Sequence, residues 1–179
     1  MKTTRLKNGQ ILNISSAVLE DAEKFANYIN TIRYESKFLS MEDKDGMSTA
    51  NSQSKWIEST FNDNRKLIFI AKIDNQIVGM CNISPISNKT RFIHRGDIGI
   101  SVLKQYWGLG IANEMMNVLI EKSKEVGYEQ MELQVVDKNE PAIHLYSKFG
   151  FYETGYIKNG MKYTDGTYAK LILMQKDLI

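Results

Sequence analysis

The sequence predicts a mixed α/β fold, with a mostly antiparallel sheet of six to seven strands and about four helices. Three observations favour this class. Strand-like and helix-like hydrophobic periods alternate along the chain, and a long helical pattern over residues 111–126 separates two strand-like runs. The 179 residues contain neither an internal repeat nor a Pro/Gly/Ser-rich linker. We therefore expect residues 1–179 to form a single domain.

The N-terminal half is expected to open with a strand and a helix and to continue into a hairpin. Ala22, Phe25 and Ile29 recur at helical spacing, whereas β-rich runs surround the turn sequence Asp74-Asn75-Gln76. The expected elements are a strand at Ile11–Ile14, a helix at Leu19–Ile32, a loop at Glu42–Asn51, a helix at Ser54–Phe61, and strands at Leu67–Ile73 and Ile77–Ile83.

The C-terminal half is expected to hold the parallel centre of the sheet. Strands at Ile93–Leu103 and Met131–Val136 flank a helix that ends before Gly127, and a crossover helix joins parallel neighbours. Pro141 suits the first turn of a further helix, and Gly150 suits the left-handed position after its end. The last two strands are expected at Phe151–Ile157 and Thr167–Lys176, joined through residues 158–166.

Composition argues against several classes of protein. Lys and Arg number 23 against 21 Asp and Glu, and no run of five like charges provides a nucleic-acid footprint. The longest apolar stretch, Leu67–Ala71, is too short to span a membrane. The single cysteine, Cys81, excludes a disulfide framework, and with only His94 and His144 no metal site is expected. The first residues lack the apolar core of a secretory signal, so we expect a cytoplasmic protein with small-molecule or protein partners.

The most informative stretch is the glycine turn Gln105–Ala112, which lies between a strand and the long helix. Its glycines let backbone N–H groups turn inward together, and the helix N-terminus adds unpaired donors and partial positive charge. Such a turn can hold a pyrophosphate, or it can be a tight strand-to-helix turn without a ligand. Asn113 breaks the dinucleotide fingerprint, and Met161 stands where a nucleoside-triphosphate loop at Gly155–Gly160 requires Lys.

Three segments resemble the GCN5-related N-acetyltransferase (GNAT) superfamily, and the resemblance extends over residues 11–174. The acetyl-coenzyme A motif of that family has Gln or Arg, two residues, Gly, one residue, and Gly or Ala; Gln105, Gly108 and Gly110 match it. The strand Asp97–Val102 is similar to the family's fourth strand, and Asn139–Phe151 is similar to its second hallmark segment. Two independent motifs in the right order argue against chance agreement.

The resemblance implies a sheet whose fourth and fifth strands splay apart, with acetyl-coenzyme A (acetyl-CoA) between them as co-substrate. Backbone groups of the fourth strand would meet the pantetheine arm, amides of the glycine turn would hold the pyrophosphate, and Asn139 would bond to the cofactor or a nearby water. The implied cofactor-binding residues are Ile100, Ser101, Val102, Gln105, Tyr106, Trp107, Gly108, Leu109, Gly110, Ile111 and Asn139.

Acetyl transfer to an amine needs a base for the amine and an acid for the departing thiolate. A phenol titrates at about 10 and a thiol at about 8.5, so a tyrosine next to the sulfur can supply the proton, and Tyr146 is the candidate acid. Tyr146 also belongs to an apolar helical face, so plain core packing is the alternative.

Asp97 is the first candidate base, and His94 and Glu35 are the alternatives. Similar enzymes often carry the longer Glu at the position of Asp97. Cys81 has no adjacent base and is expected to be a structural thiol, which leaves direct attack in a ternary complex.

The acceptor groove in such folds lies between the segment after the first helix and the final hairpin. That segment is locally negative, which would attract a cationic amine; the alternative is a solvated acidic loop with the hairpin tyrosines packed at strand edges. Its acidic residues are Glu35, Glu42, Asp43 and Asp45, and the tyrosines on or near the hairpin are Tyr152, Tyr156, Tyr163 and Tyr168.

The expected function is an acetyl-CoA-dependent N-acetyltransferase that acts on a primary amine of a small molecule. A protein or peptide N-terminus is the alternative acceptor, and an acyl-CoA-binding module without turnover is the alternative class. Neither nucleic acid nor a membrane is expected as a partner, and both a monomer and a homodimer are compatible with the sequence.

Overall fold

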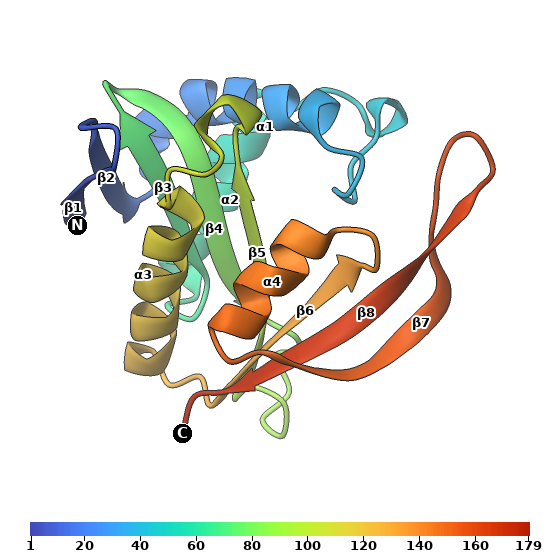
Figure 1. Cartoon of the computed structure of the whole chain (residues 1–179). Helices are drawn as coiled ribbons and strands as arrows, with labels where there is room; N and C mark the ends of the chain where they lie inside the picture. The colour runs from blue at the N-terminus through green and yellow to red at the C-terminus, as the bar shows by residue number, and fades with distance from the viewer.

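The computed structural model describes residues 1–179, apart from the side chain of Asp43, which lies outside the described residues (Figure 1). Its strands are β1 (Lys2–Arg5), β2 (Ile11–Ser16), β3 (Leu67–Ile73), β4 (Gln76–Pro85), β5 (Arg95–Val102), β6 (Gln130–Val136), β7 (Tyr152–Lys162) and β8 (Tyr168–Asp177). Its α-helices are α1 (Ala22–Glu35), α2 (Ala50–Asn62), α3 (Ile111–Glu125) and α4 (Glu140–Lys148). Short 3₁₀ turns are η1 (Leu19–Asp21), η2 (Asp43–Asp45) and η3 (Lys104–Tyr106).

The strands form one sheet in the order β1-β2-β3-β4-β5-β6-β8-β7. Every neighbouring pair is antiparallel except β5 and β6, which are parallel and joined through α3. This confirms the mixed α/β class, the four α-helices and the parallel centre. The strand count is corrected from six or seven to eight, because β1 was not expected. β1 reads Lys-Thr-Thr-Arg and is an edge strand, so it has no apolar alternation by which to recognise it.

The hairpin between β3 and β4 forms at the expected turn. Asp74 and Asn75 have φ angles of 47° and 65°, a left-handed pair that matches the twist of the flanking strands. The pairing shifts by one residue between Ala71 and Lys72, opposite Gly79 and Ile77. The bulged strand therefore presents its side chains to a different face on either side of the irregularity.

Helices cover the sheet on both faces, with α3 and α4 in front of it and α1 and α2 behind it in Figure 1. α1 and α2 pack on their face through one apolar cluster, which includes Phe25, Ile57 and Ile70. α3 and α4 pack on the opposite face through a second cluster, which includes Met115 and Leu119. Any site that opens through the sheet is therefore walled by different helices on its two sides.

Two helix boundaries differ from the expectation. α1 begins at Ala22, after η1, and continues to Glu35, three residues beyond the expected end. α2 begins at Ala50 inside the expected loop, because Thr49 and Ser52 form a reciprocal capping box at its start. The extension places Gln53 within the helix. No helix in the described part of the chain combines the length and apolar character needed to cross a membrane.

Candidate active site

β5 and β6 are paired over only the first part of their length. The pairs are Arg95 with Gln130, Gly96 with Met131, and Asp97 with Glu132. Beyond them β5 continues to Val102 and β6 to Val136, each still bonded to its other neighbour, β4 or β8. The two strands therefore diverge after Asp97 (Figure 1). They correspond to the expected splayed pair, which is fifth and sixth here because β1 adds a strand.

The open edge of β5 carries unpaired backbone groups. The Leu103 amide donates to the Val78 carbonyl of β4 at 2.9 Å, and backbone direction alternates along a strand. Ile100 and Val102 therefore direct their N–H and C=O groups into the gap. The Trp107 indole nitrogen donates to the Val102 carbonyl at 2.7 Å, which agrees with this orientation.

A cleft of about 1350 Å³ opens at the divergence. It is lined by Tyr146, Asp97, Glu35 and all the expected cofactor-binding residues except Gln105, which lies exposed in η3. His94 precedes β5 and is not among the lining residues.

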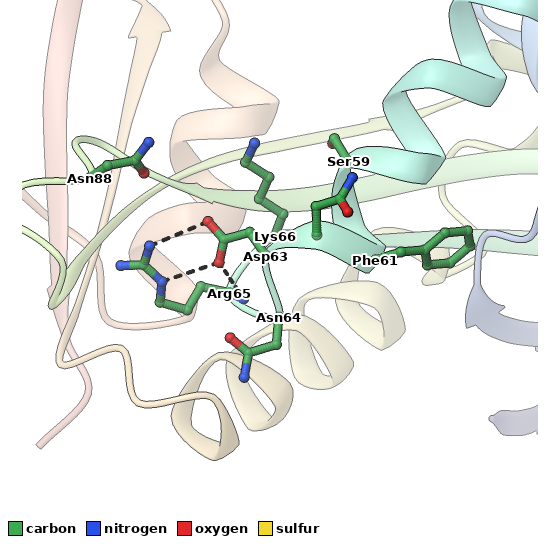
Figure 2. Close-up of a pocket in the computed structure, with 8 residues that line it drawn as sticks. Ser59, Phe61, Asp63, Asn64, Arg65, Lys66 and Asn88 are labelled. Carbon is green, nitrogen blue, oxygen red and sulfur yellow. Dashed lines mark hydrogen bonds and ion pairs between the residues drawn. The ribbon is translucent and has the colours of Figure 1, made fainter.

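A second hollow, of about 740 Å³, lies where α2 runs into β3 (Figure 2). Asp63 there accepts hydrogen bonds from the Arg65 backbone amide at 3.0 Å and from the Arg65 guanidinium at 3.2 and 3.3 Å. Desolvation opposes the shift, but the hydrogen bonds from the Arg65 backbone amide and then from its guanidinium hold the pKa of Asp63 below its usual range. Asp63 is satisfied by Arg65, whereas Nη1 of Arg65 is buried without a hydrogen-bond partner among the described residues.

The glycine turn leads into α3 in left-handed backbone conformations. Gly108 and Gly110 have φ angles of 77° and 88°, which favour glycine, and a Cβ on either would meet nothing within 4 Å. Among the described residues, none accepts a hydrogen bond from the amides of residues 108–113. The helix N-terminus adds its partial positive charge to these donors. The turn is therefore an open anion cradle.

Three cations of the cleft gather around this cradle. The Lys148 ammonium donates to the Asn113 side chain in the first turn of α3 at 2.7 Å. β1 is tied to the same turn by an ion pair of 2.7 Å between Lys2 and Glu114, and the residues that follow bring Arg5 and Lys7 into the lining. The positive charge of the cleft thus lies at the α3 end.

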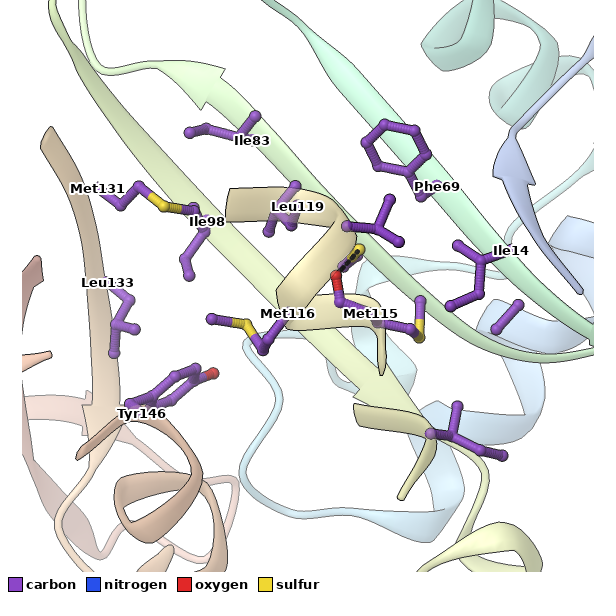
Figure 3. Close-up of a cluster of buried hydrophobic side chains, with 14 of the residues drawn as sticks. Ile14, Phe69, Ile83, Ile98, Met115, Met116, Leu119, Met131, Leu133 and Tyr146 are labelled. Atoms are coloured by element: carbon purple, nitrogen blue, oxygen red, sulfur yellow. Dashed lines mark hydrogen bonds between the residues drawn. The ribbon is translucent and has the colours of Figure 1, made fainter. Parts of the chain in front are cut away.

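Tyr146 of α4 faces the gap from the α3 side (Figure 3). It is 7% exposed, and its ring packs against Phe151 with centroids 5.7 Å apart. Its hydroxyl makes no hydrogen bond to any residue that the structure describes. Burial raises the pKa of Tyr146 to about 12, and the negative charge of Asp97 contributes to the rise. The group is a protonated phenol whose donor is free for a ligand.

Asp97 occupies the last paired position of β5, opposite Glu132 of β6. Arg95 holds Glu132 in a bidentate ion pair, with Nη2 to Oε2 at 2.7 Å. Desolvation within the cleft raises the pKa of Asp97, and the negative charge of Glu132 raises it further. The sequence does not single out Arg95 or Glu132, because their importance depends on strand register.

Glu35 lies at the end of α1 on the rim of the cleft. Its carboxylate accepts a hydrogen bond from the Lys104 amide at 2.7 Å and so caps the start of η3. Glu35, one of the alternative candidate bases, therefore links the α1 side of the cleft to the segment that leads into the glycine turn.

The wall on the α1 and α2 side is apolar. Leu39, Met41 and Trp56 are half-buried on the apolar cluster beneath α1 and α2, and they line the cleft. Of the hairpin, Met161 and Leu171 line the cleft, and the expected tyrosines do not. Tyr152, Tyr156 and Tyr168 are 46%, 62% and 52% exposed and lie outside the cleft lining, in agreement with the alternative of tyrosines at strand edges. The side chain of Asp43, expected in the acidic segment, lies outside the described residues.

Residues 29–151 match the family model described as the Acetyltransferase (GNAT) family. This match covers more than half of the chain, and the chain belongs to that family. The resemblance recognised from the two sequence motifs is therefore confirmed.

Two relatives are about one third identical to the chain over the residues that align. An N-alpha-acetyltransferase of Sulfurisphaera tokodaii is 32% identical over 112 residues, which are 58% of this chain and 66% of that protein. The L-amino acid N-acetyltransferase AaaT of Escherichia coli is 32% identical over 110 residues, which are 60% of this chain and 65% of that protein. The chain thus spans just under two thirds of the length of these curated relatives.

A solved acetyltransferase of the GNAT family from Streptococcus pneumoniae has the same fold. It superposes with a TM-score of 0.87 at 27% sequence identity, and the match covers 93% of this chain and 99% of that chain.

Proposed function

We propose that this chain is an acetyl-CoA-dependent N-acetyltransferase that acetylates a primary amine, with a small molecule as the first candidate acceptor. The observation that carries the proposal is the juxtaposition of an unpaired strand edge and an open anion cradle in one cleft. Membership in the acetyltransferase family supports the same conclusion.

The residues present fit acetyl-CoA. The free amides of residues 108–113, together with Arg5, Lys7 and Lys148, suit its phosphates. The backbone N–H and C=O groups of Ile100 and the N–H group of Val102, which β6 leaves unpaired, suit the amide-bearing pantetheine arm, whereas the Val102 carbonyl accepts from the Trp107 indole. Asn139 heads α4 with a side chain that caps no amide of its own helix, so it is free to bond to the ligand. When bound, the coenzyme supplies an acetyl group activated as a thioester.

The two titratable side chains suit opposite ends of the transfer. In the reaction, the amine nitrogen forms a bond to the acetyl carbon and the bond from that carbon to sulfur breaks. Asp97, with its raised pKa, takes the proton that the amine loses, directly or through water. Tyr146 donates its proton to the departing thiolate from the α4 side. Both protons are then accounted for without a covalent acyl-enzyme.

Cys81 supports this choice of direct attack. The thiol is completely buried, and its sulfur faces the Met115 carbonyl at 3.8 Å. Burial raises the pKa of Cys81 far above the range in which a thiolate forms. It therefore has neither the ionisation nor the access of a nucleophile.

The test follows thiol release while the protein turns over acetyl-CoA with panels of polyamines, aminoglycosides, amino acids, amino-acid amides and peptides. Acceptor-dependent release is the expected result. Coenzyme A binding without release for any acceptor would instead identify a binding module. The peptide arm tests the alternative acceptor, which the name of the Sulfurisphaera relative makes worth including.

A further inference from the structure

The wall formed by Leu39, Met41 and Trp56, hereafter the apolar wall, is held firmly in place. Trp56 stacks on Phe25 with ring centroids 5.4 Å apart and an interplanar angle of 18°. All three side chains pack on the apolar cluster beneath α1 and α2, while part of their surface lines the cleft. A hydrocarbon group of the acceptor would therefore gain contact here without first ordering the wall.

Gln53 lies one helical turn before Trp56 and also lines the cleft. It is 7% exposed, and its amide nitrogen donates to the Ser48 hydroxyl at 2.7 Å. Ser48 is itself fixed by Asn30, which exchanges two hydrogen bonds with its backbone at 2.9 and 2.8 Å. The Ser52 hydroxyl donates to the Thr49 carbonyl at 2.8 Å, so Ser48 donates to Ser52 and is left to accept from the Gln53 amide nitrogen, which orients the amide.

The carbonyl oxygen of Gln53 is left without a hydrogen bond to any of the described residues. A buried carbonyl without a donor carries the full penalty of its desolvation. The oxygen has almost no exposed surface, so a ligand N–H group reaches it when the Gln53 side chain turns toward the cleft, and that contact would remove the penalty. Next to the apolar wall there is therefore one hydrogen-bond acceptor, the Gln53 carbonyl, that lacks a donor.

The charges of the cleft restrict the kind of acceptor molecule that can carry this N–H donor. Arg5, Lys7 and Lys148 are the cleft-lining cations of the described chain, and all three are grouped around the α3 end. On the acceptor side the charged residues are Glu35 and Asp97. An ammonium group is favoured there, whereas a free carboxylate on the acceptor would meet like charge and no partner.

We infer that the preferred acceptor is an α-amine next to a large apolar side chain, on a residue whose carboxyl group is in amide linkage. The side chain contacts the apolar wall, and the amide N–H donates to the Gln53 carbonyl. This inference rests on the proposed transferase function. An amino-acid amide and the N-terminus of a peptide share this chemistry, whereas a free amino acid and a simple polyamine lack it.

The test compares kcat/KM for L-leucinamide, L-leucine, glycinamide and 3-methylbutylamine, which remove one recognised feature at a time. Leucinamide is expected to exceed glycinamide by about 10- to 200-fold, the usual worth of an apolar group in a pocket. It is also expected to exceed leucine and 3-methylbutylamine by about tenfold. A tetrapeptide beginning with Leu is the second arm: a preference for it over leucinamide assigns the source to a polypeptide, and the reverse assigns it to a small amide.

Gln53→Met keeps the size of the side chain and removes the acceptor. It should lower kcat/KM for leucinamide to the value for 3-methylbutylamine. Gln53→Glu, which retains acceptor oxygens, should keep kcat/KM for leucinamide above that value.

Calorimetry with N-acetyl-L-leucinamide gives a readout apart from turnover, with binding expected for the wild type and lost in Gln53→Met. Equal use of leucine and leucinamide, or an unchanged preference in Gln53→Met, would overturn the inference while thiol release still upheld the transferase. Absence of release with every amine would overturn both.

Discussion

Tyr146 and Asp97 approach the gap between β5 and β6 from different elements; Tyr146 is buried, whereas Asp97 is exposed and only partly desolvated by the surrounding cleft. Tyr146 is held in an apolar setting that keeps its phenol protonated, and no described residue uses its hydroxyl. Asp97 lies beside a second carboxylate at the point where strand pairing ends. Such a pair of groups with perturbed pKa values is typical of acid–base sites.

Tyr146→Phe should lower kcat by about 100-fold or more, because it removes the proton donor and leaves the ring in place. Thermal unfolding should be nearly unchanged, since the hydroxyl makes no hydrogen bond within the described chain. Stopped-assay kinetics and calorimetric melting together check this. A variant with wild-type kcat would show that Tyr146 is a core residue and nothing more.

The acidic limb of the pH–rate profile should report on Asp97. Its raised pKa means that the base form is lost at a higher pH than for an ordinary aspartate, so activity should fall earlier on acidification. Glu132→Gln removes one of the causes of the raised pKa and should move the limb to lower pH. Profiles of kcat/KM for the two proteins measure the shift, and an unmoved limb would dissociate Asp97 from the base step.

The same residue should lower the stability of the fold at neutral pH. A carboxyl whose pKa is higher in the folded state binds more protons there, so the free energy of unfolding decreases as pH rises through the window above its unfolded pKa. Asp97→Asn is therefore expected to stabilise the protein at pH 7 and to have little effect near pH 3. Urea melts at the two pH values give the comparison, and destabilisation at pH 7 would contradict the sign.

The role of a single residue could be predicted where a sequence motif determines it. It could not be predicted where the role depends on a contact with a residue distant in sequence. Gly108 and Gly110 could be assigned to the cradle because their spacing and their place before a helix leave few alternatives. Gln53 could not be singled out, since its free carbonyl depends on Ser48 taking its amide nitrogen. Glu132 likewise gains its effect on Asp97 only through the pairing of two strands that are distant in sequence.

At the scale of elements, the site is made by a parallel pair that separates and a turn that stays open. Both Gly108 and Gly110 have left-handed backbones, and the space beside them is empty of protein. Loss of either feature would remove a ligand surface and leave the sheet intact.

Gly108→Ala tests the turn, and Gly166→Ala in the β7–β8 turn is its matched control. Gly166 has a φ of 85° and likewise nothing within 4 Å of a Cβ, so both variants should lose about 1–2 kcal/mol of stability. Only Gly108→Ala should also weaken coenzyme A binding, by about tenfold or more, because its methyl group enters the cradle. Calorimetric titration of the pair decides; equal affinities would exclude residue 108 from the site.

Periodicity predicted elements well where one face is buried and poorly where none is. The β3–β4 hairpin, α3 and the Pro141 helix lie close to their expected places. β7 is exposed along almost its whole length, and its pairing with β8 shifts twice, so its extension to Lys162 had no apolar pattern to mark it. The length of the splay could not be predicted either, because it depends on where two separate strands stop pairing.

Considered as a whole, the molecule brings two different environments together through one sheet. The face with α3 and α4 supplies the cradle, the cations and Tyr146, whereas the face with α1 and α2 supplies the apolar wall and Glu35. Asp97 lies where the gap opens between them. This separation of charge suits an anionic coenzyme on one side and an amine on the other.

Residues 1–179 stay a predicted single domain, and the continuous sheet gives that prediction a test. Since β1 and β8 belong to the same eight-stranded sheet, unfolding should be cooperative. Urea transitions followed by far-UV circular dichroism and by fluorescence of Trp56 and Trp107 should coincide. Separate midpoints would indicate parts that fold independently.

The central claim is that backbone amides of residues 108–113 and the open edge of β5 receive a coenzyme A derivative. Amide NMR spectra recorded during titration with coenzyme A address it residue by residue. The largest shifts are expected at residues 108–113, with further shifts at Ile100 and Val102 and none at the Asp63–Arg65 hollow. Unchanged amides in the glycine turn under saturating coenzyme A would contradict it.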